Sequence, residues 1–424
     1  MSFFNIMNKF GYGSSLLVGI SIFLSEKLEN NVALPLIAVL FAIQMLLKIN
    51  RENFFKLLDK KIGLGIIIFS VLPVIISIID GGIKSRGDNY NLKYLYFFPL
   101  IYFLDNYKKI INFLKSLLLS AIISMIVTVG IFIKNYETWA HPKGFEYPRI
   151  YFVLPVQDFA NLMCIVFLFL LSFIFFYKNN NKKKLLYVRI FLIAISLLNL
   201  FVLLVNRSKM VYVSLIPAIL YILYKKNKKY ILTFLFLCTS GYFILPKLIT
   251  ERLKYIIFFK KDPSSNLRLI FWDAGFHAFL RSPLLGWRNM DRKSFNLDYY
   301  KKTGVLDYVT KNYGFTLLKS YINSHNAYLQ FLLDYGILGF LSFMFLFVII
   351  IPVKLFKMSF YSLENESKYF PIEVSLKSVF IAWFIQGMTE INLSNRPIVI
   401  FTVIFLAIVN YLYKVWSNRK EEEK

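Results

Sequence analysis

The feature that most constrains this chain is a succession of apolar runs, each long enough to cross a lipid bilayer. A transmembrane helix needs about 20 predominantly apolar residues, because the bilayer core offers no water to the backbone. A soluble all-α protein would instead need polar faces at helical spacing, which most of these runs lack. The sequence therefore predicts an all-α, polytopic membrane protein with about twelve transmembrane helices. They are expected at residues 11–25, 31–48, 62–80, 92–104, 110–133, 151–177, 186–205, 210–224, 230–248, 328–353, 374–391 and 397–416.

The distribution of basic residues predicts which ends of these helices face the cytoplasm. Of the 50 Lys and Arg residues, 26 fall on the side that holds both termini, and ten fall in the short loops of the other side. Cytoplasmic loops are enriched in Lys and Arg, so both termini are expected in the cytoplasm. Much of the net charge of +26 is thereby assigned to a membrane surface, and no nucleic-acid partner is expected.

A long polar segment from Lys247 to His325 holds the other 14 basic residues and only six acids. Long loops are translocated largely regardless of charge, so this outward loop of about +8 fits the orientation. We expect nine transmembrane helices in residues 1–248, a large periplasmic helical loop in 249–327, three more helices in 328–416 and a cytoplasmic tail in 417–424. A basic loop beside a membrane suits an anionic headgroup or a phosphorylated ligand, but such charges can also simply keep a loop soluble.

Local patterns place a helix within this loop. Residues 266–280 have apolar side chains at helical spacing, which predicts an amphipathic helix near the membrane surface with Arg268 in its first turn. Pro283 is expected to stop this helix, and Gly286 marks a turn. Residues 135–150 contain two prolines and are expected to form a loop.

Several kinds of chemistry lack their usual motifs. The two cysteines, Cys164 and Cys238, lie within apolar runs and do not suggest a disulfide framework. Neither a His/Cys cluster with metal-ligand spacing nor a Walker-type glycine loop is present, so no metal or other cofactor is expected. Of the three histidines, His141 and His277 are expected to be structural or exposed.

His325 has a different setting, because it lies where the polar loop ends and an apolar helix begins. A neutral imidazole there can take a proton from a sugar hydroxyl, although a single histidine more often only forms hydrogen bonds. Arg207, Arg268 and Arg396 map to the same outer side. Arginines at a bilayer surface can bind a lipid phosphate, or can act as interface anchors. Two guanidiniums and one base suit the displacement of a diphosphate from an activated sugar.

Three short motifs resemble those of the O-antigen ligase and polymerase superfamily of polytopic bacterial glycosyltransferases. The first is Asn206-Arg207-Ser208 after an apolar run, and the second is Arg268 with Trp272 ahead of Pro-Leu-Leu-Gly-Trp at 283–287. The third is Ser-His-Asn-Ala-Tyr-Leu at 324–329, followed by Gly336 and Gly339. The resemblance covers residues from about 200 to 345.

The resemblance implies an inverting, metal-independent transfer of a glycan from undecaprenyl diphosphate on the periplasmic face of the inner membrane. It assigns donor diphosphate binding to Arg207 and Arg268, activation of the acceptor hydroxyl to His325, and a further basic role to Arg396. The chain looks most similar to an O-antigen ligase, whose acceptor is lipid A–core oligosaccharide. The alternatives are an O-antigen polymerase, a protein O-oligosaccharyltransferase, and a transporter of the lipid-linked glycan, for which Asp158 and Glu390 would be the intramembrane candidates.

Overall fold

The computed structural model describes residues 3–80, 90–141, 149–258, 262–287, 289–313, 324–361, 368–390, 392–393 and 396–422. Every secondary-structure element in these ranges is helical, which confirms the all-α prediction. The first half contains α1 (Phe3–Leu24), α2 (Glu26–Leu28), the π-helical η1 (Glu29–Ala33), α3 (Leu34–Leu46), α4 (Arg51–Leu57), α5 (Lys60–Ile79), the 3-10 helix η2 (Lys93–Tyr96), α7 (Phe97–Phe103), α8 (Tyr107–Lys134), α9 (Tyr136–Ala140) and α10 (Val156–Phe176). The second half contains α11 (Lys182–Asn206), α12 (Lys209–Lys226), α13 (Lys229–Ile244), α14 (Lys247–Ile257), α15 (Pro263–Arg281), α16 (Asn289–Lys302), α17 (Val305–Tyr313), α19 (Ala327–Phe343), the π-helical η4 (Met344–Ile350), α20 (Ile351–Lys357), α21 (Phe370–Gln386) and α22 (Arg396–Glu422).

Several of these helices can cross a membrane. Within the described ranges, seven are long and apolar enough to do so by length and composition: Glu26–Leu46, Lys60–Ile79, Tyr107–Lys134, Val156–Phe176, Lys182–Asn206, Ala327–Lys357 and Pro397–Glu422. The five other expected spans fall on α1, η2 with α7, α12, α13 and α21, which do not meet the same criterion. The structure thus supports a multi-pass membrane protein, and the count of twelve remains a prediction.

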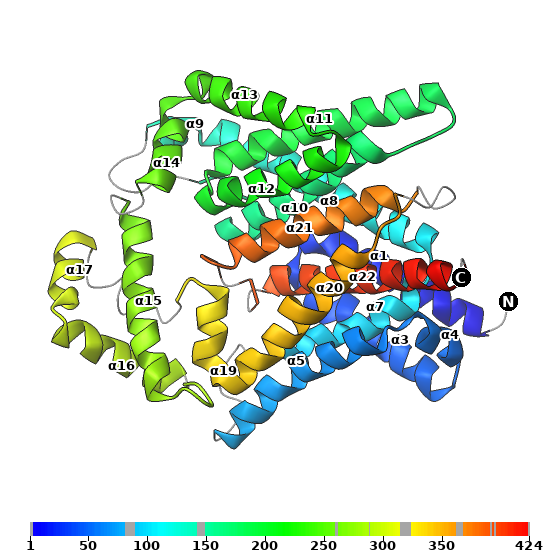
Figure 1. The fold of residues 1–424 in the computed structure, drawn as a ribbon, viewed down its shortest axis with the longest axis horizontal. Helices are drawn as coiled ribbons and strands as arrows, with labels where there is room; N and C mark the ends of the chain where they lie inside the picture. Colours follow the sequence, from blue (N-terminus) through cyan, green and yellow to red (C-terminus); the bar gives the residue numbers. More distant parts are fainter. Residues whose placement is uncertain are drawn as a thin grey trace.

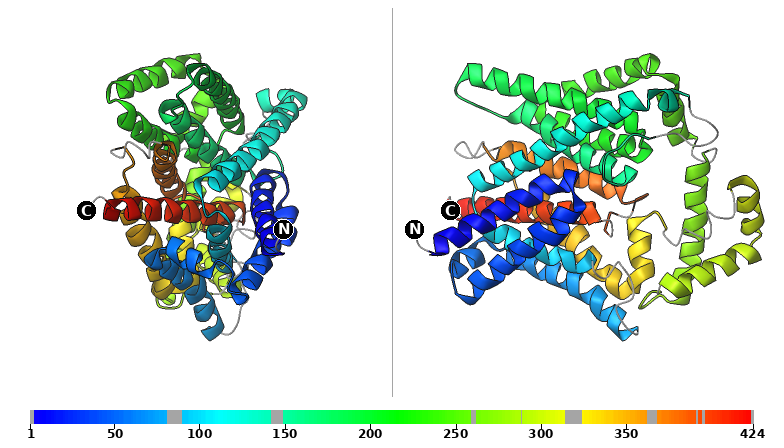
Figure 2. Two further views of the ribbon diagram at one scale, coloured as in Figure 1. Left: turned by 90° about the vertical axis from the view of Figure 1, so that its right-hand side faces the viewer. Right: turned by 180° about the vertical axis from the view of Figure 1, so that it is seen from behind.

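The long helices lie side by side along the longest axis of the molecule, with α22 in the middle (Figures 1 and 2). In the most apolar stretch of α22, 83% of the residues are buried, and α21 packs against α10 and α12 beside it. Both termini lie at one end of the bundle, and α15, α16 and α17 lie at the opposite end. This arrangement separates the long loop from the termini, as the charge distribution predicts.

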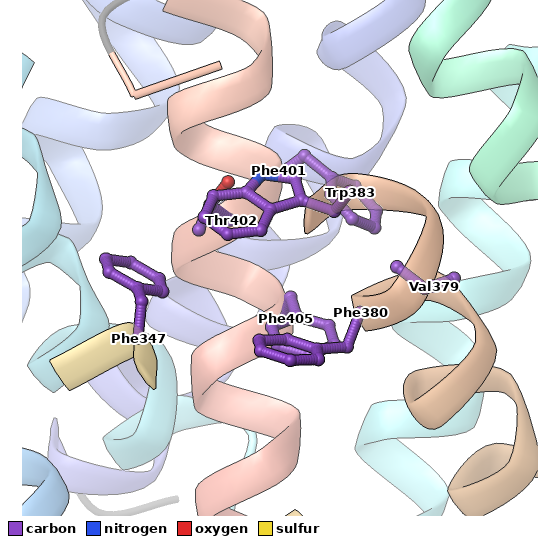
Figure 3. Close-up of a pocket in the computed structure, with 7 residues that line it drawn as sticks. All are labelled: Phe347, Val379, Phe380, Trp383, Phe401, Thr402 and Phe405. Carbon is purple, nitrogen blue, oxygen red and sulfur yellow. The ribbon is translucent and has the colours of Figure 1, made fainter. Parts of the chain in front are cut away.

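The bundle core is rich in aromatic contacts. The Phe69 ring lies 5.2 Å from Phe331 and 5.1 Å from Phe347, so α5 is packed onto α19 and η4. Aromatic pairs of this kind stabilise a core beyond the area that they bury. A small pocket between η4, α21 and α22 is lined by Phe347, Val379, Phe380, Trp383, Phe401, Thr402 and Phe405 (Figure 3). Its almost entirely apolar lining makes it a packing feature rather than a site for a phosphorylated substrate.

Two local predictions need correction. The loop helix begins at Pro263, capped by Asp262, so Arg268 lies in its second turn and not in its first. Residues 135–150, predicted to form a loop, include the short helix α9, whose Trp139 is buried. The ends predicted from Pro283 and Gly286 are confirmed, because α15 stops at Arg281 and Gly286 has a positive φ of 77°.

The end of α15 is joined to α19 by an exchange of backbone hydrogen bonds. α19 is kinked at Gly336 (φ 61°, ψ −166°). In a regular helix Ile337 N–H would donate to the Leu333 carbonyl, but here both groups have other partners. The Leu333 carbonyl instead accepts from Trp287 N–H at 2.7 Å, and Ile337 N–H donates to the Pro283 carbonyl at 2.8 Å. Residues 283–287 therefore supply the partners that the kinked helix lacks. We call this contact the backbone clasp.

The backbone clasp requires glycine at two positions. A Cβ atom on Gly286 would lie 2.6 Å from the Leu333 carbonyl oxygen, and one on Gly336 would lie 2.2 Å from the Leu284 carbonyl oxygen. Both glycines also have a positive φ, which side chains other than hydrogen disfavour. Two of the three glycines in the resemblance motifs, Gly286 and Gly336, thus have a direct steric role.

We expect Gly286→Ala and Gly336→Ala to destabilise the protein more than Gly304→Ala, as measured by thermal unfolding in detergent. Gly304 has a similar φ of 69°, but a Cβ atom there would have no neighbouring atom within 4 Å, so it reports the φ penalty alone, about 1–2 kcal/mol. Gly286→Ala and Gly336→Ala should lower the free energy of unfolding by about 1–3 kcal/mol more, because the added methyl group overpacks the clasp. Equal losses at all three positions would contradict the clasp.

Candidate functional site

His325 is held at the start of α19 by the cap of that helix. The side chain of Asn326 accepts hydrogen bonds of 3.0 Å from two backbone N–H groups of the first turn. The Ala327 N–H donates to the Gly387 carbonyl at 2.8 Å, which ties this corner to the end of α21. His325 itself has a φ of 49°, in the left-handed region that histidine enters more readily than most residues. Backbone strain of this kind is enriched at functional sites.

The loop helix α15 places two side chains beside His325. The Phe271 ring lies 6.1 Å from the imidazole at an interplanar angle of 25°, so the two rings are stacked. Arg268 lies one turn earlier on α15, and its charge acts on the imidazole. α15 can approach closely because Gly275 leaves room for Leu329 and Leu333 of α19. The structure therefore brings together Arg268 and His325, two of the predicted site residues.

The environment of His325 favours the neutral imidazole. Burial lowers its pKa, and the positive charge of Arg268 lowers it further, to about 4. Protonation would occur only as the pH falls towards that value, so the ring is neutral at pH 7. A neutral ring nitrogen can accept a proton, and an anionic substrate bound at Arg268 would offset the second cause and raise this pKa.

Arg268 forms a buried ion pair with a residue from a distant part of the chain. Its Nη2 lies 3.1 Å from Oε1 of Glu390, and the two side chains are only 12% and 7% exposed. Arg149 and Asp158 also act electrostatically on Glu390, and Arg149 donates to the Gln157 side chain at 3.0 Å. The site thus contains two arginines and two carboxylates. Buried charges of this kind are costly unless they are paired.

Arg207 lies at the corner between α11 and α12 and is fully buried. Its Nη2 donates to the Trp139 carbonyl at 2.9 Å, and its guanidinium lies 3.8 Å from the centre of the Trp139 ring. This is a cation–π contact supported by a hydrogen bond. Arg207 is therefore positioned by α9, the helix that the sequence does not predict.

A second ion pair connects this corner to the loop helix. Lys209, two residues after Arg207, pairs with Asp262, the N-cap of α15, and both side chains are buried. Burial raises the pKa of Asp262, but hydrogen bonds from Lys209 and Ser265 outweigh this effect and lower it overall. The carboxylate therefore stays ionised and capped. Through this pair, the corner that carries Arg207 and the helix that carries Arg268 have a fixed spacing.

Sequence reasoning misses several residues of this site. The sequence-based prediction assigns no role to Arg149, Gln157 or Trp139. It includes Glu390 and Asp158 only as intramembrane candidates for a transporter. In the structure Asp158 lies in the first turn of α10, and Glu390 lies beyond the end of α21. Neither short motifs nor spacing relate these residues, because their partners come from distant segments. Arg396 is the first residue of α22, and its side chain lies outside the described part of the chain.

In the described ranges no three His, Cys, Asp or Glu side chains are grouped so that they could hold a metal ion. The chemistry available from these residues is that of arginine cations, carboxylates and one neutral imidazole.

One comparison with known proteins identifies a family for part of the chain. Residues 194–344 match a protein-family model described as O-antigen ligase. This range includes Arg207, Arg268, the backbone clasp and His325. No curated protein matches the chain.

We expect the ¹³C NMR signal of the His325 ring to titrate with a midpoint near pH 4, which can be followed because the chain has only three histidines. Arg268→Gln should move the midpoint upward, since it removes the positive charge that helps to lower this pKa. The midpoint should stay below 6.5, because burial of the ring is the larger cause of the lowered pKa. A midpoint near 6.5 in the unmodified protein would contradict the geometry of the site.

Proposed function

We propose that this chain is a member of the O-antigen ligase superfamily, whose family model matches residues 194–344, and that it transfers a glycan from undecaprenyl diphosphate to lipid A–core oligosaccharide. The reaction would take place at the periplasmic face of the inner membrane. The observation that carries this proposal is the pairing of a neutral imidazole, His325, with the guanidinium of Arg268 inside the matched segment.

In the proposed reaction, His325 takes the proton from an acceptor hydroxyl as the oxygen attacks the anomeric carbon of the donor sugar. The bond between that carbon and the phosphate oxygen breaks, and undecaprenyl diphosphate leaves with the electron pair. Attack opposite the leaving group inverts the anomeric configuration. Arg207 and Arg268 stabilise the growing negative charge of the diphosphate. No metal ion has a part in these steps.

The buried pair between Arg268 and Glu390 supports a role in diphosphate binding. A carboxylate and a phosphate can form similar bonds with a guanidinium, so a donor can replace Glu390 as the partner of Arg268. The nearby Arg149 would add positive charge to the same region. Arg396, at the start of α22, is proposed as a further basic residue of the donor site.

The orientation follows from the arrangement of the bundle. We propose twelve transmembrane helices, both termini in the cytoplasm, and the loop helices α14 to α17 at the periplasmic face. The positive charge distribution and the separation of α15 to α17 from the termini support this topology (Figure 1). The donor lipid would enter from the membrane toward Arg207 and Arg268.

Within the superfamily, a single large outer loop favours the ligase. Polymerases more often have two large outer loops, and the other outer segments here are short, such as residues 135–150. Protein O-oligosaccharyltransferases usually carry additional outer sequence after the last helices. A transporter would need ionisable residues along a path at mid-membrane depth. Asp158 lies in the first turn of α10, and Glu390 lies beyond the end of α21 and pairs with Arg268, which argues against that alternative.

We expect His325→Asn to reduce transfer by about 10²–10⁴-fold in membranes of equal protein content, with donor binding retained. Asparagine tolerates the left-handed backbone at this position but cannot act as a general base, so the loss would not reflect backbone strain. Arg207→Lys and Arg268→Lys should keep only part of the activity, because lysine cannot form a bidentate pair. Arg281→Lys, at the exposed end of α15, is the matched control. Normal transfer by His325→Asn would refute the proposed base.

Deletion of the gene should separate the ligase from its alternatives in gels of lipopolysaccharide and of lipid-linked glycan. If the protein is a ligase, the deletion strain should have lipid A–core without glycan, and long chains should accumulate on undecaprenyl diphosphate. Core that carries a single repeat would indicate a polymerase. Unchanged lipopolysaccharide would refute both and point to another acceptor or to a transporter.

A further inference from the structure

A row of aromatic rings lies where α15 and α16 pack together. Four residues form the row, Trp287, Phe295, Tyr299 and His277, and we call it the aromatic ledge. The distances between successive ring centroids are 5.4 Å, 6.3 Å and 4.8 Å. His277 is 46% exposed, and the three other rings are partly exposed, so a ligand can reach the ledge from outside the protein.

Polar groups lie beside the rings at one end of the ledge. The hydroxyl of Tyr299 donates to the Asp273 carboxylate at 2.6 Å, and this carboxylate belongs to a side chain that is 58% exposed. Burial raises the pKa of the Tyr299 hydroxyl to about 12, helped by the Asp273 charge, so the hydroxyl keeps its proton. The Nδ1 atom of His277 lies 3.0 Å from the backbone carbonyl of Asp273. A carbonyl can only accept, so this contact is a hydrogen bond when Nδ1 carries the hydrogen, which leaves Nε2 directed away from the helix backbone.

The ledge has a fixed position relative to the proposed catalytic residues. The indole Nε1 of Trp287 donates to the Ala278 carbonyl at 2.7 Å, and its backbone N–H is part of the backbone clasp. Beneath the ledge, Tyr300 is buried against Phe271, whose ring stacks on His325. Tyr300 and Phe271 thus hold α16 on α15, and this packing does not require an exposed carboxylate and imidazole beside the neighbouring rings.

We propose that the aromatic ledge is a saccharide-binding subsite. The C–H face of a pyranose ring packs on aromatic rings, and its hydroxyls form hydrogen bonds with a carboxylate, a phenol and an imidazole nitrogen. Binding sites commonly combine aromatic surface with a few polar groups that fix orientation. The exposed carboxylate of Asp273 would repel a phosphate, and an acyl chain could form no hydrogen bonds with these polar groups. A neutral sugar carries no charge that Asp273 would repel, and its hydroxyls can form hydrogen bonds with these polar groups.

The position of the ledge indicates which sugars would bind there. Phe271 and Asp273 are two residues apart on α15, so they face different sides of the helix. The ledge and His325 are therefore separated by about the width of a helix, roughly 10–12 Å. The reacting sugar cannot occupy both places, so the ledge would hold later units of a glycan chain. This inference rests on the proposed function, in which either the donor glycan or the acceptor core could supply those units.

The first test measures binding without turnover, using the full-length protein in nanodiscs and saturation-transfer NMR. Two soluble probes are compared: the glycan released by mild acid from the lipid carrier, and the core oligosaccharide released by mild acid from lipopolysaccharide. We expect one probe to bind, and its affinity to fall at least tenfold in His277→Ala and Tyr299→Ala. His325→Asn should bind normally. Tyr308→Ala, which removes a 48% exposed ring of α17 outside the ledge, is the matched control.

The outcomes are distinct. Binding of the lipid-carrier glycan assigns the ledge to the donor, and binding of the core oligosaccharide assigns it to the acceptor. If neither probe binds, or if both ledge variants bind as the unmodified protein does, the proposal is overturned. His277→Ala removes a half-exposed side chain, so it keeps the test informative even if Tyr299→Ala fails to fold. A protein that binds the glycan at the ledge but transfers none would refute the proposed reaction and leave the subsite standing.

A second measurement uses transfer kinetics. For a donor with a long glycan, or for the core acceptor, His277→Ala should raise the KM at least tenfold with little change in kcat. A donor that carries only one sugar should show no change if the ledge binds the donor chain. A loss of kcat with an unchanged KM would mean that His277 acts only through the fold, and would overturn the subsite.

Discussion

The site depends on the exchange of backbone hydrogen bonds between residues 283–287 and the kink of α19 at Gly336. A helix that opens at its middle leaves a carbonyl and N–H groups without partners, and in an apolar bundle these would be costly. The loop that follows α15 supplies the partners, so the kink and the loop are stable only together. The loop helix is thereby fixed across the end of the bundle, and Arg268 and Phe271 reach the histidine that precedes α19. The two positive-φ glycines follow from this contact, because only they allow two backbones to approach so closely.

The charges of the site are compatible with this rigid frame because each has a defined partner. Asp262 pairs with Lys209 at the start of α15, and Glu390 pairs with Arg268 in its second turn. The first pair is part of the helix cap and has a structural role. The second consists of side chains that are 12% and 7% exposed and belong to segments far apart in the sequence. Glu390 lies beyond Gly387, the C-cap of α21, so the proposed exchange of this carboxylate for a phosphate at Arg268 would leave the end of α21 intact. The structure thus supports different roles for two ion pairs that sequence alone could not distinguish.

Much of the fold follows from local properties of the sequence. Apolar runs predict helices because an amide in hydrocarbon must be paired within its own segment, and Pro283 and Gly286 mark the end of α15 by backbone chemistry alone. The site could be predicted only where a motif contains the residue, as for Arg207, Arg268 and His325. Glu390 and Arg149 escaped prediction because their roles arise from packing between α10, α15 and the end of α21. Trp139 escaped for another reason: the prolines around it suggested a loop, and its helix has a single turn.

The same dependence on tertiary contact explains why α15 can have different chemistry on its two sides. On the side toward α19, Gly275 leaves room for Leu329 and Leu333, and Arg268 and Phe271 lie beside His325. Asp273 and His277 lie next to the rings of α16, and their side chains are 58% and 46% exposed. A polymeric substrate has two matching needs: a reacting end that is shielded from water, and a long remainder that must stay hydrated while it is held. A single helix lying across the end of the bundle can meet both needs, because residues two positions apart face different environments.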